Sequence, residues 1–553
     1  MTKWQKIIFL LILILAFILR FYKLGEIPAG FHADEAVVGY NAYSFLTTGR
    51  DEYGNTPSFT LRSFDDFRPA LYTYLTIPAI AAWGSNEYAV RIPAAVFSFL
   101  TVVLFYYLTY RITRDRQISI YSTFLLAVSF WHLDLSREAS EKVVALFLVL
   151  AGIFFLFIFK EEKRKRDLFL AFISWFLAVN TYYAPRFFLP PFLLVLFLIY
   201  RKSIFGKIKI LPVCLILFFL LLLFYFSFIF KGSTIRLAQL NVFTHPEVRL
   251  VLEEQIREEP VGANLLLTRV FHNKIVNYSL AVISKYGEYF NLDFLVMGKG
   301  EPARVIIPNV GLLSIVEIPF LLAGIYFFLR EKKDWNIFLL FWILIAPLPA
   351  AFTVDETPNV CRTLIMLPAL DITTAYGFIK IKNMVATRKR LLLLPFFFII
   401  ISGFFSWNFF YYLHQYYIHQ RFHRPWYRHY GYKELVSYVD SVKKNYRQIY
   451  ITKAYGSPYI FFLFYSKYDP KTYWSYGSPR DKDWGGFDNY VFIPENCPLR
   501  VKKEDPLKRI NGEKGILYVN MGECEMPKTN AKLLKTIFRE DNTPAFQILE
   551  YVE

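Results

Sequence analysis

The chain has 553 residues, of which 55% are hydrophobic and 19% aromatic, and its mean hydropathy is +0.32. Water-soluble globular proteins do not sustain such values over this length, so the composition predicts an α-helical membrane protein rich in aromatic residues. The net charge of +18 invites a nucleic-acid-binding interpretation, but the placement of the charges argues against it.

Apolar runs long enough to cross a bilayer, or nearly so, recur along the chain, and we count about eleven. They lie at about 7–22, 89–110, 117–132, 143–159, 167–185, 187–200, 210–230, 306–329, 335–352, 363–380 and 392–412. The run at 70–83 is shorter and carries a proline, which predicts an interfacial or re-entrant helix.

The short loops between these spans differ sharply in charge. Loops on one side carry basic clusters such as 160–166 and 380–390. Loops on the other side hold only a few cations, namely Arg137, Lys142, Arg186 and Arg362. Basic loops stay in the cytoplasm, so the asymmetry predicts a multi-pass protein of the cytoplasmic membrane with its N-terminus inside and its C-terminus outside. The first span then reads as uncleaved.

This topology places two long loops, 22–88 and 231–305, and the tail outside. We expect a transmembrane domain over 1–412 and a small α/β domain over 413–553. The tail pattern predicts helices at 432–446 and 457–468 and strands at 448–452, 490–493, 515–519 and 545–552. Cys497 and Cys524 fall in this exported tail, where they form either a disulfide or two buried thiols.

The two long loops also have helical patterns. The segment 34–48 reads as an amphipathic helix with Val38, Ala42, Phe45 and Leu46 on one face. In the second loop, 247–259 predicts a charged helix and 271–286 an amphipathic one.

An acidic pair, Asp34 and Glu35, directly follows the first span. Carboxylates at the mouth of a membrane bundle suggest chemistry at the membrane surface. The structural alternative is that Asp34 caps a helix starting near Ala36, because Asp is a preferred N-cap residue. One Asp can serve both purposes.

Further charged residues are expected on the same side. The acids are Asp34, Glu35, Asp65, Asp66, Glu138 and Glu141, and the bases are Arg68, Arg137, Lys142, Arg186, Arg304 and Arg362. Each base alone reads as a helix end reaching toward water. Together they predict a site for an anionic headgroup, since arginine offers phosphate a planar pair of donors.

The expected side of the membrane limits the chemistry. Nucleotide sugars and ATP are absent outside the cell, so a transferred group must arrive activated on a membrane carrier such as a polyprenyl phosphate. Transfer then needs a general base for the acceptor hydroxyl and positive charge for the departing phosphate. Walker A, dinucleotide-binding and HExxH motifs are absent from the sequence.

Four ordered motifs resemble the GT-C superfamily of membrane glycosyltransferases, in particular the protein O-mannosyltransferase and lipid A aminoarabinose transferase group. They are FHADE at 31–35, FRPALY at 67–72, GSNEYAVRIP at 84–93 and SREASE at 136–141. The resemblance implies that Asp34 is the base, that Glu141 and Arg137 match a second acidic site in the fourth span, and that the sugar is transferred with inversion.

The chain also departs from that group. Arg68-Pro69-Ala70 stands where the family often has Lys-Pro-Pro, and Phe67 stands where aminoarabinose transferases carry Glu, with Asp66 one step earlier. A further phosphate-binding Lys has no clear counterpart, and Arg186 is its candidate substitute. These departures disfavour aminoarabinose transfer to lipid A.

We therefore expect a polyprenyl-phosphate-sugar-dependent, inverting glycosyltransferase that transfers a hexose or pentose to a glycolipid, protein or wall-polymer acceptor. The candidate residues are, as catalytic carboxylates, Asp34, Glu35 and Glu141; for phosphate, Arg137, Arg68, Arg186, Arg304 and Arg362; and as other substrate contacts, Asp66, Glu138, Lys142 and His272. A divalent metal, Mg²⁺ or Mn²⁺, is left open. Alternatives are a transporter or flippase and a non-catalytic subunit that binds lipid carriers.

Overall fold

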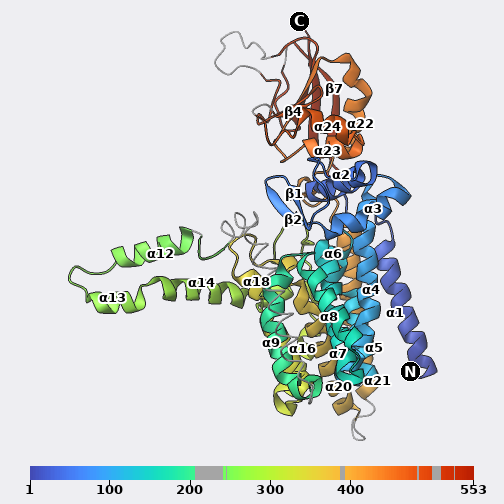
Figure 1. Ribbon diagram of the computed structural model, residues 1–553, viewed down its shortest axis with the longest axis vertical. Helices are drawn as coiled ribbons and strands as arrows, with labels where there is room; N and C mark the ends of the chain where they lie inside the picture. The colour runs from blue at the N-terminus through green and yellow to red at the C-terminus, as the bar shows by residue number, and fades with distance from the viewer. Residues whose placement is uncertain are drawn as a thin grey trace. The chain divides into compact units, whose positions relative to one another are not determined.

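Two units make up the chain in the computed structural model (Figure 1), which describes residues 1–205, 241–244, 246–386, 393–482, 485–500, 512–527 and 530–552. The first unit contains Met1–Arg20, Val96–Ser136 and Glu141–Tyr412. The second contains Phe21–Ala95, Arg137–Ser140 and Leu413–Glu553. Each unit is built from segments that lie far apart in the sequence.

Apolar helices dominate the first unit, as the composition predicts. Its helices are α1 (Lys3–Phe21), α4 (Glu87–Thr113), α5 (Arg116–Val128), α6 (Phe130–Ser136), α7 (Glu141–Glu162), α8 (Lys165–Val179), α9 (Ala184–Phe205), α12 (Pro246–Arg257), α13 (Leu265–Phe271), α14 (Lys274–Glu288), α15 (Leu292–Leu295), α16 (Glu317–Glu331), α17 (Asp334–Ile345), α18 (Leu348–Ala351), α19 (Val360–Thr363), α20 (Leu367–Val385) and α21 (Leu393–His414). α1, α4 and α21 also extend into segments of the second unit.

Seven spans in the described residues are long and apolar enough to cross a membrane, and eight if the bent pair α5 and α6 is one span. The seven coincide with predicted spans, and α5 and α6 meet at a 51° bend within the predicted span 117–132. α8 and α16 occupy two more predicted spans but have 15 residues each. The predicted span 210–230 lies outside the described residues. The protein is a multi-pass α-helical membrane protein.

Small residues allow close helix packing in the bundle. A Cβ added to Gly377 of α20 would lie 1.9 Å from the carbonyl oxygen of Phe320 in α16, and one added to Gly324 would lie 2.1 Å from that of Thr373. The backbones of α16 and α20 are therefore in direct contact at this crossing. Contacts of this kind are how helices associate in lipid, where apolar side chains gain little by leaving the surrounding hydrocarbon.

The second unit joins the first loop to the C-terminal tail. Its loop elements are α2 (Ala33–Thr48), the hairpin β1 (Thr60–Ser63) and β2 (Asp66–Pro69), and α3 (Leu71–Trp83), which is the predicted interfacial helix. Phe31 stacks on Phe464 with ring centroids 5.0 Å apart, and a Cβ on Gly39 would lie 2.4 Å from the Phe464 ring. The loop and the tail therefore share one hydrophobic core.

The expectation of a one-sided amphipathic α2 is wrong. Val37, Tyr40 and Ala42, which belong to different faces of the helix, are all buried, whereas Leu46 is exposed. α3 and α23 (Tyr459–Tyr465) both pack against α2 and cover more than one of its faces. The sequence of the loop alone could not indicate a partner that lies about four hundred residues further along the chain.

The tail forms the expected small α/β domain. Its described sheet has strand order β4-β5-β3-β6-β8-β7, with β3 parallel to both β5 and β6 and the other pairs antiparallel. The strands are β3 (Gln448–Thr452), β4 (Gly486–Phe487), β5 (Tyr490–Ile493), β6 (Ile516–Met521), β7 (Ala531–Phe538) and β8 (Pro544–Tyr551), and the helices include α22 (Tyr432–Val442), α23 and α24 (Pro470–Tyr476). Strands β3 and β5 match their predicted bounds, while β4, β7 and α24 were missed.

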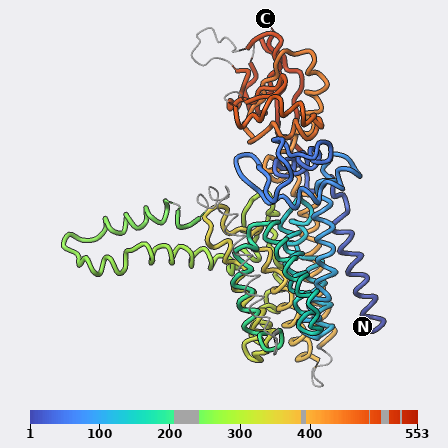
Figure 2. Tube along the Cα trace, in the orientation of Figure 1, coloured from blue at the N-terminus to red at the C-terminus, as the bar shows by residue number. Residues whose placement is uncertain are grey.

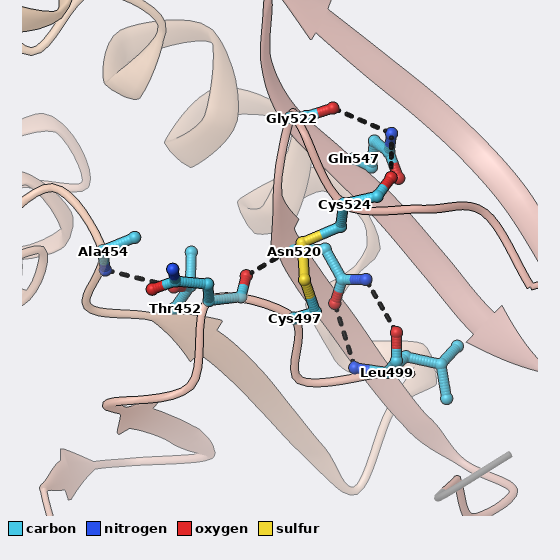
Figure 3. Close-up of a disulfide and its surroundings, with 9 residues drawn as sticks. Thr452, Ala454, Cys497, Leu499, Asn520, Gly522, Cys524 and Gln547 are labelled. Carbon is cyan, nitrogen blue, oxygen red and sulfur yellow. Dashed lines mark hydrogen bonds between the residues drawn. A yellow bond between two sulfur atoms is a disulfide. The ribbon is translucent and has the colours of Figure 1, made fainter. Parts of the chain in front are cut away.

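A disulfide joins Cys497 to Cys524 beside strand β6 (Figure 3), which settles the two alternatives for this pair. The Asn520 side chain accepts a hydrogen bond from the Leu499 N–H and donates one to the Leu499 carbonyl, at 3.0 and 2.8 Å. The Gln547 amide donates to the carbonyls of Gly522 and Cys524. The crosslink and these bonds fasten the segment around Leu499 to the sheet.

Reduction of this disulfide should destabilise the sheet domain. The two cysteines have a sequence separation of 27. A crosslink that closes a loop of this length lowers the conformational entropy of the unfolded chain, which stabilises the folded domain by on the order of 3 kcal/mol. We expect reductant to accelerate proteolysis of the tail in the full-length protein, followed by gel electrophoresis and mass spectrometry. A Cys524→Ala variant should be cleaved rapidly with or without reductant. Equal protection of wild type in both conditions would contradict the expectation.

Candidate active site

His32, rather than Asp34, caps helix α2, so the alternative in which Asp34 caps a helix starting near Ala36 is wrong. The helix begins at Ala33, and the His32 Nδ1 accepts a hydrogen bond from the Asp34 N–H at 3.2 Å. The Glu35 carboxylate in turn accepts one from the His32 N–H, which completes a capping box. The Asp34 carboxylate lies in the first helical turn and is not needed for the cap.

Asp34 pairs with Arg68, which joins two residues that the sequence placed in one site. An Arg68 Nη2 lies 2.8 Å from Asp34 Oδ1, and the His32 Nδ1 lies 3.4 Å from Asp34 Oδ2. Arg68 is presented by the β1–β2 hairpin, where it lies opposite Leu61. Both side chains of the pair retain 29% exposure, so this carboxylate and guanidinium remain accessible to a substrate. Asp66 lies at the start of the same strand, opposite Ser63.

Glu35 has very different surroundings from its neighbour. It is buried, and the Arg91 guanidinium donates to both of its oxygens at 3.0 and 3.1 Å. The Ala139 N–H donates to it as well, at 3.0 Å. Burial by itself raises the pKa of Glu35, but the charge and hydrogen bonds of Arg91 outweigh this and hold the pKa below its ordinary value of 4.5.

Arg91 connects Glu35 to the backbone of the first loop. It is fully buried and also donates to the carbonyls of Leu24, Pro28 and Gly30. Sequence reasoning missed this residue, although a charged side chain within an apolar span was a signal that could have found it. The ion pair with Arg91 therefore fixes Glu35 in the first turn of α2, the turn that also carries Asp34, and the predicted catalytic role of Glu35 stays a prediction.

Arg137 and Glu138 belong to the same unit and are also held by protein groups. Arg137 donates to the carbonyls of Tyr22 and Ile27 at 2.6 and 3.0 Å and to the Tyr416 hydroxyl at 3.1 Å. Its guanidinium is buried. Glu138 pairs with Arg428 at 2.6 Å. The phosphate-binding role of Arg137 and the substrate contact by Glu138 stay predictions.

A further buried carboxylate in this unit, Glu52, lies in a cluster of tyrosines that the sequence did not indicate. It is buried, and it interacts electrostatically with the hydroxyls of Tyr40, Tyr53, Tyr459 and Tyr473. Burial, with a smaller contribution from Asp51, raises the pKa of Glu52 to about 8. Its carboxyl group is therefore protonated in the folded protein at neutral pH.

This raised pKa predicts a pH-dependent stability. The unfolded chain releases the Glu52 proton near the ordinary pKa of 4.5, whereas the folded chain keeps it until about pH 8, so stability falls as pH rises through that interval. Glu52→Gln removes the titration. The variant should match wild type in thermal unfolding near pH 4.5 and exceed it by a few kcal/mol near pH 8. A difference that does not grow with pH would contradict the protonated state.

The first unit holds a separate group of the predicted residues. Lys142 and Glu141 begin α7 and pair at 3.0 Å, and Lys142 lies 5.7 Å from the ring centroid of Tyr182. Lys142 and Arg362 both interact electrostatically with the Tyr182 hydroxyl. Tyr182 was not predicted from the sequence. This cationic cluster could bind an anion within its own unit.

The remaining candidates have local partners. Arg362 donates to the Thr353 hydroxyl and the Asp355 carbonyl, both at 2.7 Å. Arg304 lies 3.9 Å from Glu356. Arg186 donates to the Val179 carbonyl at 2.8 Å. His272 contacts Gln255 and Glu259 at 3.2 and 3.3 Å, both within the helical segment 246–290.

The described residues contain no group of three or more His, Cys, Asp or Glu side chains placed to hold a metal ion. The Asp34 carboxylate is instead engaged by Arg68 and His32, a cation and an imidazole, which is not a donor set for Mg²⁺ or Mn²⁺. The groups around Asp34 therefore do not fit the divalent metal that the sequence left open.

The fold is similar to the folds of two membrane glycosyltransferases of known structure, as the resemblance drawn from the sequence motifs implied. The chain superimposes with a TM-score of 0.53 on ArnT from Cupriavidus metallidurans bound to undecaprenyl phosphate, at 9% identity over 98% of this chain and 97% of that one. It superimposes with a TM-score of 0.51 on the Archaeoglobus fulgidus oligosaccharyltransferase tethered to an acceptor peptide, at 13% identity over 84% of this chain and 63% of that one.

Sequence comparison finds two further similarities, each over only part of the chain. Residues 68–226 match the family described as dolichyl-phosphate-mannose-protein mannosyltransferase. An uncharacterized protein of Aquifex aeolicus is 28% identical over 193 residues, which are 35% of this chain and 38% of that protein. The chain thus spans less than two thirds of both this relative and the archaeal oligosaccharyltransferase.

Proposed function

We propose that this protein is an inverting glycosyltransferase that moves a sugar from a polyprenyl-phosphate carrier to an acceptor at the outer face of the cytoplasmic membrane. The observation that carries the proposal is the pair of adjacent carboxylates in α2. Glu35 is buried and bound by Arg91, whereas Asp34 stays accessible with Arg68 beside it. An accessible carboxylate next to a cation is what a general base beside a leaving phosphate requires.

The proposed reaction is a single displacement. The acceptor oxygen attacks the anomeric carbon from the face opposite the phosphate, and its proton passes to an Asp34 carboxylate oxygen. The bond between the anomeric carbon and the phosphate oxygen breaks, and its electron pair leaves with the polyprenyl phosphate. Arg68, which pairs with Asp34 at 2.8 Å, supplies positive charge near the reacting groups and the leaving phosphate.

Similarity supports the class of donor and acceptor. The structural relatives include one bound to undecaprenyl phosphate and one tethered to an acceptor peptide. The matching family is described by a dolichyl-phosphate sugar and a protein acceptor. A hexose or pentose donor and a protein, glycolipid or wall-polymer acceptor follow from these by analogy. The disulfide also suits a compartment outside the cytoplasm.

The test is transfer by the purified full-length protein in vesicles supplied with synthetic polyprenyl-phosphate hexoses and pentoses. Mass spectrometry should detect release of polyprenyl phosphate coupled to glycosylation of an acceptor extracted from the native envelope. A transporter or a carrier-binding subunit would bind the donor and leave its sugar–phosphate bond intact. Glycans missing from a deletion strain identify the acceptor.

The side of the membrane can be tested independently. Because the basic clusters lie in loops on one side, a reporter enzyme fused to the C-terminus should be active only outside the cytoplasm. A reporter fused within the basic loop 160–166 should be active only inside. Cytoplasmic activity of the C-terminal fusion would mean that the number of spans differs by one from our count.

A further inference from the structure

Residues 246–290, hereafter the arm, expose many large apolar side chains. α12 and α14 lie side by side and α13 connects them, as Figures 1 and 2 show. The exposed apolar residues of the arm are Leu250, Val251, Ile256, Val261, Leu265, Leu266, Leu267, Val270, Phe271, Ile275, Leu280, Ile283 and Phe290. Scattered single residues of this kind need no explanation, but a contiguous set indicates a binding surface.

Most of the exposed apolar residues belong to α13 and α14, although Leu250, Val251 and Ile256 of α12 are exposed as well. Val248 and Leu252 of α12 are buried, and Asn277 of α14 donates to Gln255 across the helix pair at 2.9 Å. The facing sides of the two helices are therefore occupied. Ile275 and Ile283 of α14 are turned away from this contact and are 80% and 64% exposed.

The charged residues of the arm also differ between α12 on one side and α13 and α14 on the other. α12 and the residues after it carry Glu247, Glu253, Glu254, Glu258 and Glu259 against Arg249 and Arg257. α13 and α14 with their junction carry Arg269, Lys274 and Lys285 against Glu288. The layer that contains α12 is thus acidic, and the layer that contains α13 and α14 is basic and exposes more of the apolar residues. A basic, apolar helix face is suited to the interface of a membrane with anionic lipids.

The contacts at the base of the arm show at which position along the bundle helices the arm is attached. The Tyr286 hydroxyl donates to the carbonyl of Leu344 at 2.7 Å. Leu344 lies one residue before the end of α17, and α14 also packs against α18 (Leu348–Ala351), which ends the span Asp334–Ala351 on the side remote from the basic residues Lys332 and Lys333. The arm therefore leaves the bundle at a membrane–water boundary, where tyrosines are commonly found. From there it runs across the direction of the helices of its own unit (Figure 2).

We propose that the arm lies on the bilayer, with α13 and the exposed face of α14 inserted among the lipids of the adjacent leaflet and α12 facing water. An element that starts at the boundary and runs across the bundle direction follows the membrane surface. Its large aliphatic side chains enter the acyl region while Arg269, Lys274 and Lys285 contact anionic headgroups. The inference does not depend on the proposed transferase activity.

The test measures the surroundings of single arm positions in the full-length protein. Ile275→Cys and Ile283→Cys report on the apolar face, and Glu254→Cys and Glu258→Cys are controls on α12, all with Cys214 and Cys361 replaced by Ala. Each cysteine carries an environment-sensitive fluorophore, and the protein is placed in vesicles of phosphatidylethanolamine and phosphatidylglycerol. Nitroxide groups on the lipid chains and iodide in the water then serve as quenchers.

We expect lipid nitroxides to quench positions 275 and 283 several-fold more than positions 254 and 258, and iodide to show the opposite preference. Lys274→Gln together with Lys285→Gln should weaken the lipid quenching. Equal access of iodide to all four positions would overturn the proposal. Protection of 275 and 283 from both quenchers would also overturn it, because the face would then be covered by protein, such as a second copy of the chain.

Discussion

Asp34→Asn should abolish sugar transfer while leaving the protein folded. As a general base, Asp34 supplies a proton-accepting oxygen that the Asn amide cannot replace, and loss of such a base lowers rates by about two to four orders of magnitude. The fold should tolerate the change because His32 caps α2. The ion pair with Arg68 is 29% exposed on both sides, and pairs of that kind contribute about 1 kcal/mol or less.

The measurement is release of polyprenyl phosphate by the purified variant, with thermal unfolding measured on the same sample. Glu26→Gln is a matched control, since it removes a carboxylate that pairs with Lys23 at 3.7 Å on the surface of the same unit. The control should keep wild-type transfer. An active Asp34→Asn variant would remove Asp34 from the chemistry and move attention to Glu141.

The features that could be predicted from the sequence are those that depend on residues close together in the chain. Long apolar runs predict spans because a bilayer of fixed thickness requires about twenty apolar residues, and the seven spans found lie where the runs do. Strands β3 and β5 were found from short apolar runs bounded by polar residues. Asp34 and Arg68 were expected in one site because both lie in motifs of the first loop, but their ion pair was not predicted.

The features missed depend on partners distant in sequence. α2 is buried on several faces because α23 packs on it, and the Tyr40 hydroxyl donates to the carbonyl of Tyr468. No pattern within 34–48 encodes that contact. The tyrosine cluster around Glu52 likewise combines the first loop with the tail. The different environments of Asp34 and Glu35, adjacent in sequence, became visible only once Arg91 was placed.

Glu35→Gln should destabilise the protein strongly, in contrast to the change at its neighbour. The substitution leaves the Arg91 guanidinium buried without a counter-charge, and breaking a buried ion pair in this way costs about 3–5 kcal/mol. It also weakens the capping box that begins α2. We expect a large fall in the midpoint of thermal or denaturant unfolding of the detergent-solubilised protein.

A second substitution distinguishes destabilisation by the unpaired Arg91 charge from a loss of catalytic function. In Glu35→Gln with Arg91→Met the uncompensated charge is gone, so the double variant should be more stable than the single one, since apolar replacement of a buried pair is often close to neutral. The rate of sugar transfer per folded molecule should recover to the extent that the start of α2 returns to its native position, because that position places Asp34 beside Arg68. If Glu35→Gln instead kept wild-type stability and lost all transfer, Glu35 would act on the substrate itself as an ionised carboxylate.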